Sequence, residues 1–281
     1  MRCYRYMPFE YCVQTILSGR FKVAKPSDFN DPFDCIGNVC GVPPQNVLRK
    51  FAATLDAAHE HSVDEVADWL GRDFDLKLAK AVQDRASIGQ LFRVLCMSDA
   101  DETDHNSETL MWAHYADKGR GVRILLDLDP DGLPIGCSYE KITYSPDGRV
   151  PILPLSTLTD FPKSPELSRF YAQCIVTKGQ SWQYEKEVRM VIGPDALSQL
   201  TIKNAVELFP LPRAFIRGLE FGSEVSEAQI SHAIDTLSQS GYALQYRWAK
   251  FSGEMYQYDY WCWDTARRRW FREEDMNGAA G

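Results

Sequence analysis

Hydrophobic and polar positions along this chain follow two different periods, which predict both strands and helices. Short runs rich in aromatic and β-branched residues have the period of two that half-buried strands show. Other segments repeat apolar residues every three or four positions, as helices with one buried face do. The expected strands cover residues 3–6, 20–24, 90–98, 122–128, 139–144, 181–192, 215–221 and 242–250, and the expected helices cover 8–18, 43–88 in two or three pieces, 107–118, 165–177 and 226–240.

The segment 181–192, SWQYEKEVRMVI, is central to the functional interpretation because it alternates charged and apolar residues. Neighbouring side chains of a strand point to opposite faces, so Glu185, Glu187 and Arg189 share one face, and the alternate positions up to Ile192 form a mostly apolar face. The two carboxylates would lie roughly 7 Å apart, too far to share a proton and close enough to serve one ligand. The alternative interpretation is an edge strand whose charges prevent pairing with another chain.

The order of the expected elements predicts an α+β protein with a mixed, mainly antiparallel sheet. A chain of 281 residues, 44% hydrophobic and 25% charged, has the length and composition of one large globular domain. We therefore expect a single domain over residues 1–281. Within it, residues 43–88 form a helical insertion that covers the sheet or recognises a partner, and residues 251–281 form an aromatic and basic C-terminal tail that packs back on the sheet.

Charge and hydropathy limit the classes of partner. The net charge of −8 argues against binding nucleic acid by bulk electrostatics, because such binding neutralises phosphates with Lys and Arg. Acidic residues follow the basic run from Arg267 to Arg272, which favours ion pairs within the chain. The first residues lack the pattern of a secretory leader, and no apolar run approaches the roughly 18 residues of a membrane helix. We expect a cytoplasmic protein without a membrane contact.

Cysteine and histidine spacing gives no metal-binding motif. The eight cysteines are scattered, with no CxxC pair and no His at ligand spacing. Without an export signal we expect reduced, buried thiols and no metal. A metal-dependent hydrolase or nuclease built on His114, Asp31 and Asp34 is an alternative, although no pair of these residues has the spacing of a metal site.

Five segments, in this order, resemble an uncharacterised bacterial domain family. The family has an aromatic-basic-aromatic opening, an FNDPFD loop, a strand ending in Cys-x-Ser, an MWxHYA helix and a WxxExExR strand. The resemblance spans roughly residues 1–192, and the family name implies no activity. The matching segments here are 4–6, 29–34, 96–98, 111–116 and 182–189.

The order of elements also resembles, more remotely, the ADP-ribosyltransferase fold. In that fold a first strand supplies a basic residue, a later strand supplies a Ser or Tyr, and a last strand supplies the catalytic Glu, often inside an ExE pair. The resemblance implies Arg5 as the basic residue, Ser98 as the hydroxyl, Glu187 as the catalytic carboxylate and Glu185 as the preceding Glu. This sequence lacks the full Ser-Thr-Ser motif and has no His at the first position.

The activity that this resemblance implies belongs to the glycosyltransferase class. NAD is cleaved between nicotinamide and ribose, and ADP-ribose passes to a macromolecular acceptor, a protein or a nucleic acid. The transition state resembles an oxocarbenium ion, which a carboxylate that binds the ribose 2′-hydroxyl stabilises. Glu187 would supply that carboxylate, and Glu185 would orient or deprotonate the acceptor.

NAD, as the substrate, would be held by a cation and by aromatic rings. Arg5 would bind the pyrophosphate with its planar fork, and Tyr4, Tyr6 or Tyr115 would stack on the nicotinamide. A lone histidine on an apolar helix face is nevertheless more often a hydrogen-bonded core residue. The expected NAD-binding set also contains Asn30, His114 and Arg189.

Two other functions stay open at this stage. NAD hydrolysis would use the same carboxylate with water as the acceptor. A non-enzymatic module would instead bind a protein partner, such as an antitoxin, in a bacterial toxin or anti-phage system. Turnover of NAD by the wild type and its loss in Glu187→Gln separate the enzymes from the module.

Overall fold

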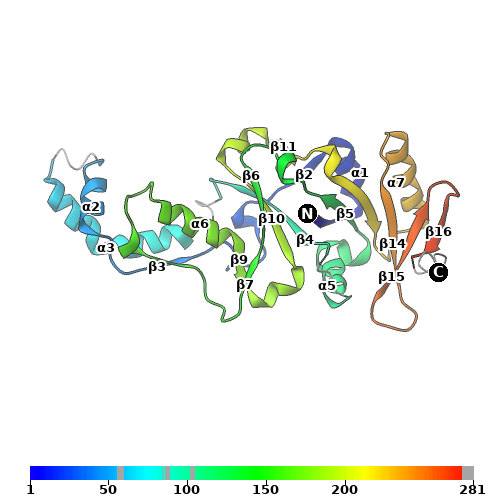
Figure 1. Cartoon of the computed structure of the whole chain (residues 1–281), viewed down its shortest axis with the longest axis horizontal. Coiled ribbons are helices and arrows are strands. Elements are labelled where there is room, and N and C mark those ends of the chain that lie inside the picture. The colour runs from blue at the N-terminus through cyan, green and yellow to red at the C-terminus, as the bar shows by residue number, and fades with distance from the viewer. Residues whose placement is uncertain (56–59, 84, 86–88, 102–104, 274–281) are drawn as a thin grey trace. The chain divides into compact units, whose positions relative to one another are not determined.

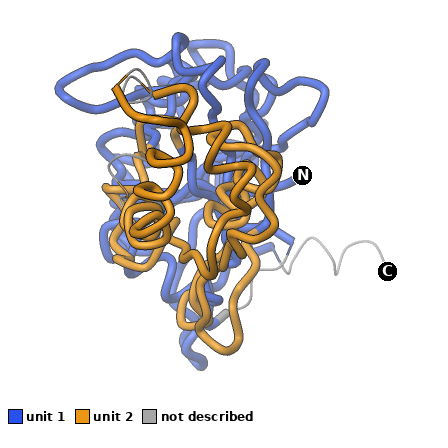
Figure 2. The backbone as a smooth tube through the Cα atoms, turned by 90° about the vertical axis from the view of Figure 1, so that its left-hand side faces the viewer, with its two compact units in different colours: residues 1–23, 94–141, 183–281 blue, residues 24–93, 142–182 orange. Residues whose placement is uncertain are grey.

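A computed structural model of the chain describes residues 1–55, 60–83, 85, 89–101 and 105–273. These residues form two compact units, which Figure 2 colours separately. Unit 1 comprises residues 1–23, 94–141 and 183–281, and unit 2 comprises residues 24–93 and 142–182. Residues 56–59, 84 and 86–88 of the expected helical insertion and 274–281 of the expected tail lie outside the described residues.

The protein is α+β, and its described residues include a nine-strand mixed sheet that is mostly antiparallel. The strand order is β16-β15-β14-β13-β5-β1-β4-β10-β6 (Figure 1). The mixed, mainly antiparallel sheet expected from the sequence is therefore confirmed. The strands are β1 (Arg2–Met7), β4 (Arg93–Asp99), β5 (Val122–Asp127), β6 (Cys137–Lys141), β10 (Glu187–Ile192), β13 (Ile216–Phe221), β14 (Gln245–Phe251), β15 (Tyr258–Asp264) and β16 (Arg269–Arg272).

The helices of unit 1 begin and end where local sequence signals place them. Helix α1 (Phe9–Ser18) ends at Gly19, whose φ of 63° suits a residue without a Cβ atom. Helix α7 (Glu227–Gln239) begins with a capping box between Ser226 and Gln229. Unit 1 also contains helix α5 (His105–Tyr115), the strands β2 (Arg20–Lys22), β11 (Thr201–Lys203) and β12 (Val206–Pro210), and the 3-10 helices η3 (Asp117–Gly119), η4 (Pro130–Gly132), η7 (Pro194–Gln199) and η8 (Arg213–Phe215). The 3-10 helix η6 (Gln180–Glu185) begins in unit 2 and ends in unit 1.

The nine-strand sheet packs hydrophobic residues on both faces. The core face carries Ile124, Leu126 and Val188, and it packs with buried residues of α1 and α7. The opposite face, called here the α5 face, carries Tyr4 and Tyr6 and packs against Met111 and Trp112 of α5. Alternation along each strand decides which residues belong to which face.

Unit 2 has a separate hydrophobic core. That core joins the insertion predicted over residues 43–88 to residues from 142–182, including Leu153 and Phe170. Gly37 is packed so tightly that an added Cβ atom would lie 2.4 Å from Phe170 Cζ. Unit 2 contains α2 (Gln45–Ala52), α3 (Val63–Gln83), α6 (Pro165–Val176), η1 (Pro26–Asp28), η5 (Leu155–Thr157) and two parallel strand pairs, β3 (Asn38–Cys40) with β8 (Ile152–Pro154) and β7 (Thr143–Ser145) with β9 (Thr177–Gly179).

Two strands predicted from the sequence differ from the observed ones. The strand predicted over 181–192 is wrong in its first half, because residues up to Glu185 form the 3-10 helix η6 and Lys186 has a φ of 45°. The strand predicted over 139–144 is interrupted at Ile142, which lies between β6 and β7.

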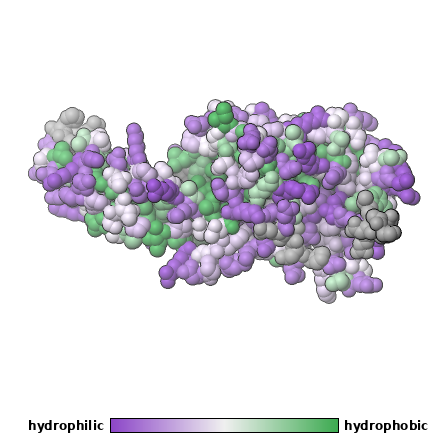
Figure 3. All heavy atoms as spheres, in the orientation of Figure 1, coloured by the Kyte–Doolittle hydropathy of each residue, from purple (hydrophilic) through white to green (hydrophobic). Residues whose placement is uncertain are grey.

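In the described part of the chain, no helix has the length and apolar character to cross a bilayer. Figure 3 shows hydrophilic residues over most of the visible face.

Candidate functional site

Glu187 and Arg189 lie on the same face of β10 and form a buried ion pair. Arg189 Nε donates to Glu187 Oε1 at 2.8 Å, and Arg189 Nη2 donates to Oε2 at 3.0 Å. Glu187 is 5% exposed and Arg189 is fully buried. Because Val188 and Met190 belong to the core face, alternation puts this ion pair on the α5 face.

The neighbouring strand β4 brings a thiol and a hydroxyl beside Glu187. The Cys96 thiol is hydrogen-bonded to Glu187, and burial raises the pKa of Cys96, with the charge of Glu187 adding to the shift. Asp99 N donates to Lys186 O at 2.8 Å, so Ser98 and Glu187 each lie one residue from this bond between the strands. Ser98 is buried, and its Oγ has no hydrogen-bond partner among the described residues.

Arg5 approaches the same strands from a different direction. It pairs across strands with Ile124, which belongs to the core face, so Arg5 points away from the α5 face. Its Nη1 donates to the backbone oxygen of Cys96 at 2.7 Å, and its buried Nε has no partner in the described part of the chain. Burial lowers the pKa of Arg5, while the nearby charges of Cys96 and Glu187 act in the opposite direction.

Glu185 is held by a residue of α5 and does not continue the row of Glu187. It lies in η6, and the Tyr115 hydroxyl donates to its Oε1. His114, next to Tyr115, is exposed, and its ring lies 6.0 Å from that of Tyr184. The expected Glu185–Glu187–Arg189 row on one strand is therefore wrong for Glu185, because the backbone leaves the extended conformation at Lys186.

Tyr4 and Tyr6 pack against an arginine of the neighbouring strand. The Arg123 guanidinium lies 3.8 Å from the centre of the Tyr4 ring and 5.7 Å from that of Tyr6. Arg123 Nη1 also donates to the Tyr6 hydroxyl at 2.9 Å. The Arg123 guanidinium therefore already interacts with both tyrosines, whose rings were expected to stack on nicotinamide.

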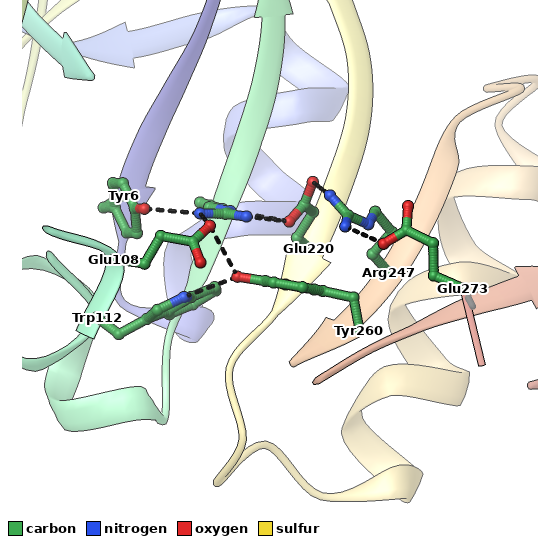
Figure 4. A network of polar contacts seen from close by, with 8 residues as sticks. Tyr6, Glu108, Trp112, Glu220, Arg247, Tyr260 and Glu273 are labelled. Carbon is green, nitrogen blue, oxygen red and sulfur yellow. Dashed lines mark hydrogen bonds and ion pairs between the residues drawn. The ribbon is translucent and has the colours of Figure 1, made fainter. Parts of the chain in front are cut away.

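A buried polar network on the α5 face includes Tyr6, Glu108 and Glu220, which Figure 4 labels, and Arg123 bonds all three. Arg123 pairs with Glu108 of α5 at 2.9 Å and with Glu220 of β13 at 2.8 Å. Although burial opposes ionisation, the charges of Arg123 and Arg247 lower the pKa of Glu220. The network continues through Arg247 to Glu273 and through Tyr260, which joins Glu108 to Trp112.

This network fixes α5 over the sheet. Glu108, Trp112 and Tyr115 are spaced four and three residues apart, so they share one face of the helix. Glu108 and Trp112 form hydrogen bonds within the network, and the Tyr115 hydroxyl donates a hydrogen bond to Glu185. The sequence analysis did not identify Arg123, although a charged residue inside the apolar run from Val122 to Leu128 is a signal of a buried ion pair.

Asn30 belongs to unit 2, where its side chain is exposed. The same unit contains a buried Lys178, whose Nζ lies 3.6 Å from Asp34 Oδ2 and 4.7 Å from the centre of the Trp182 ring. The sequence analysis missed Lys178, because nothing local marks a lysine in a short strand as buried. Asp34 and Trp182 both come from the motifs that define the family resemblance.

Within the described residues, no group of three or more His, Cys, Asp or Glu side chains is arranged to hold a metal ion. The structure brings together Glu187, Arg189, Cys96 and Ser98 on adjacent strands, and a separate hydrogen bond joins Tyr115 to Glu185. Comparisons of this chain with models of protein families, with curated proteins and with solved structures gave no match.

Proposed function

We propose that this protein cleaves the nicotinamide–ribose bond of NAD and transfers ADP-ribose to a macromolecular acceptor, as a member of an ADP-ribosyltransferase-like fold. One observation carries the proposal: Glu187 is a buried carboxylate, bound at both oxygens by Arg189, and the neighbouring strand carries Ser98, whose hydroxyl has no partner among the described residues. A buried carboxylate with a fixed orientation is the group that an oxocarbenium-like transition state requires.

In this reaction the bond between C1′ of the ribose and the nicotinamide nitrogen breaks, and its electron pair leaves with nicotinamide. The ionised carboxylate of Glu187 stabilises the positive charge on the ribose and accepts a hydrogen bond from the 2′-hydroxyl. A nucleophilic atom of the acceptor then bonds to C1′ and loses its proton to a base. Glu185 is the base that the proposal assigns, oriented by the Tyr115 hydroxyl.

The proposal gives Ser98 and Arg5 separate roles. The Ser98 hydroxyl, which no described residue bonds, would hydrogen-bond the substrate. Arg5 lies on the other face of the sheet and acts on Glu187 through its charge, without touching the pyrophosphate. Because Arg123 occupies Tyr4 and Tyr6, stacking of the nicotinamide falls to Tyr115.

The test is nicotinamide release from NAD labelled in its nicotinamide ring, with a second label in the adenylate to follow transfer. The acceptors are a cell extract and its nuclease-treated and protease-treated fractions. Glu187→Gln should reduce release by about a hundred- to a thousandfold. Glu227→Gln, which removes an exposed carboxylate from the first turn of α7, should retain full release.

Two results would overturn the proposal: no release by the wild type with any fraction, or full release by folded Glu187→Gln. Release of nicotinamide without transfer of the adenylate label would instead identify NAD hydrolysis. Far-ultraviolet circular dichroism and urea unfolding of each variant separate a loss of chemistry from a loss of folding.

A further inference from the structure

A cavity of about 420 Å³ lies in unit 1 between α5 and the loop that joins β14 to β15. Thr109 of α5 lines one side, and residues 251–258 line the rest. The loop extends beyond the neighbouring strands in Figure 1. The volume falls within the range that holds a side chain or a small ligand.

The loop exposes three large apolar side chains around this cavity. Phe251 is 64% exposed, Met255 is 63% exposed and Tyr256 is fully exposed. Phe251 also stacks on Tyr258, with ring centres 5.5 Å apart, so part of the lining is rigid aromatic surface. Methionine and aromatic residues gathered at one exposed place are typical of protein-binding surfaces.

The charge at the cavity is negative. Glu254 is the charged residue among the described residues that line the cavity. Those lining residues include no Lys, Arg or His. The carboxylate of Glu224 also acts on the Tyr258 hydroxyl, as does that of Glu108, which is paired with Arg123. The nearby cation Lys250 points to the other face of β14, where it lies 4.0 Å from the centre of the Trp248 ring.

We propose that this cavity is a docking site for a cationic segment of a protein partner. A Lys or Arg side chain enters beside Glu254 and packs on the rings of Tyr256 and Phe251, because an aromatic face next to a carboxylate attracts a cation. An apolar neighbour in the segment covers Met255. The chain itself has a net charge of −8, which favours encounter with a basic partner. This inference does not depend on NAD chemistry.

The test uses a short labelled peptide that repeats Arg-Leu-Gly, with matched peptides that carry Glu for Arg or Ser for Leu. Fluorescence anisotropy should show binding of the first peptide to the full chain and weaker binding of both others. Glu254→Gln and Tyr256→Ala should each weaken binding about two- to fivefold. Glu227→Gln and Ile202→Ala, which change an exposed carboxylate and an exposed apolar side chain elsewhere in unit 1, should not.

Three outcomes would overturn the docking site. The first is no binding of the cationic peptide to the wild type, or equal binding of the acidic one. The second is the same loss in Glu227→Gln as in Glu254→Gln, which would indicate bulk electrostatics. The third is a dimer in light scattering that Tyr256→Ala converts to a monomer, which would assign the loop to self-association.

Discussion

Arg189 binds both carboxylate oxygens of Glu187 from two positions further along the same strand. Residues two apart on a strand share a face, so the ion pair forms within β10 and does not need a second element. Both side chains are buried, and water cannot replace either partner. The pair therefore fixes the orientation of the carboxylate to which the proposed reaction assigns the central role.

Removal of Arg189 should strongly destabilise the protein. Arg189→Met removes two charge-assisted hydrogen bonds from the buried Glu187 carboxylate, and the free energy of unfolding should fall by about 3–5 kcal/mol. Urea unfolding followed by circular dichroism measures the change. Arg217→Met is the control, because Arg217 is 56% exposed and pairs with a half-exposed Asp127, so its loss should cost less than about 1 kcal/mol. Equal losses in the two variants would contradict the buried pair.

The stability of Ser98→Ala should show whether the Ser98 hydroxyl is available to bind a ligand or stabilises the fold. The buried Oγ of Ser98 has no partner in the part of the chain that the structure describes, so removing it should leave the free energy of unfolding unchanged or raise it by up to about 1 kcal/mol. Ser164 is the matched control, since its equally buried Oγ accepts from Leu167 N at 3.0 Å, and Ser164→Ala should cost about 1 kcal/mol. A similar loss in both variants would show that Ser98 has a structural role.

Tyr260→Phe should loosen α5. The Tyr260 hydroxyl donates to Glu108 Oε1 at 3.3 Å and accepts from Trp112 Nε1 at 3.4 Å. Its loss should cost about 1–2 kcal/mol and increase amide hydrogen exchange in α5, because both groups are anchors of that helix. Tyr256→Phe, at a fully exposed side chain, should change neither. Unchanged exchange in α5 of Tyr260→Phe would show that the hydroxyl does not anchor the helix.

Stability should fall in strongly alkaline solution. Burial raises the pKa of Tyr4 and of Tyr6 to about 12, despite the opposing charge of Arg123. An unfolded tyrosine ionises near pH 10, so between about pH 10 and pH 12 the unfolded state binds fewer protons and stability decreases as pH rises. Urea unfolding across this range should show the decrease, and Tyr4→Phe should reduce its slope. Tyrosinate absorbance of the folded protein that shows all tyrosines ionising near pH 10 would contradict it.

The sequence by itself determined most local structure and the sheet class. The period of two at Val188, Met190 and Ile192 placed the apolar face of β10 in the core, and the signals at Gly19 and Ser226 gave the end of α1 and the start of α7. These features depend on residues within a few positions of one another. A single sequence can therefore specify them.

Only the tertiary structure decided which charged residues of different elements meet. The same local alternation that explained Val188 failed at Glu185, because Lys186 adopts a positive φ and Tyr115 holds the Glu185 carboxylate from α5. Arg123 and Glu220 are 97 residues apart and pair only because β5 and β13 are neighbours in the sheet. Sequence spacing does not set such distances, since they follow from strand order and from the face on which each side chain lies.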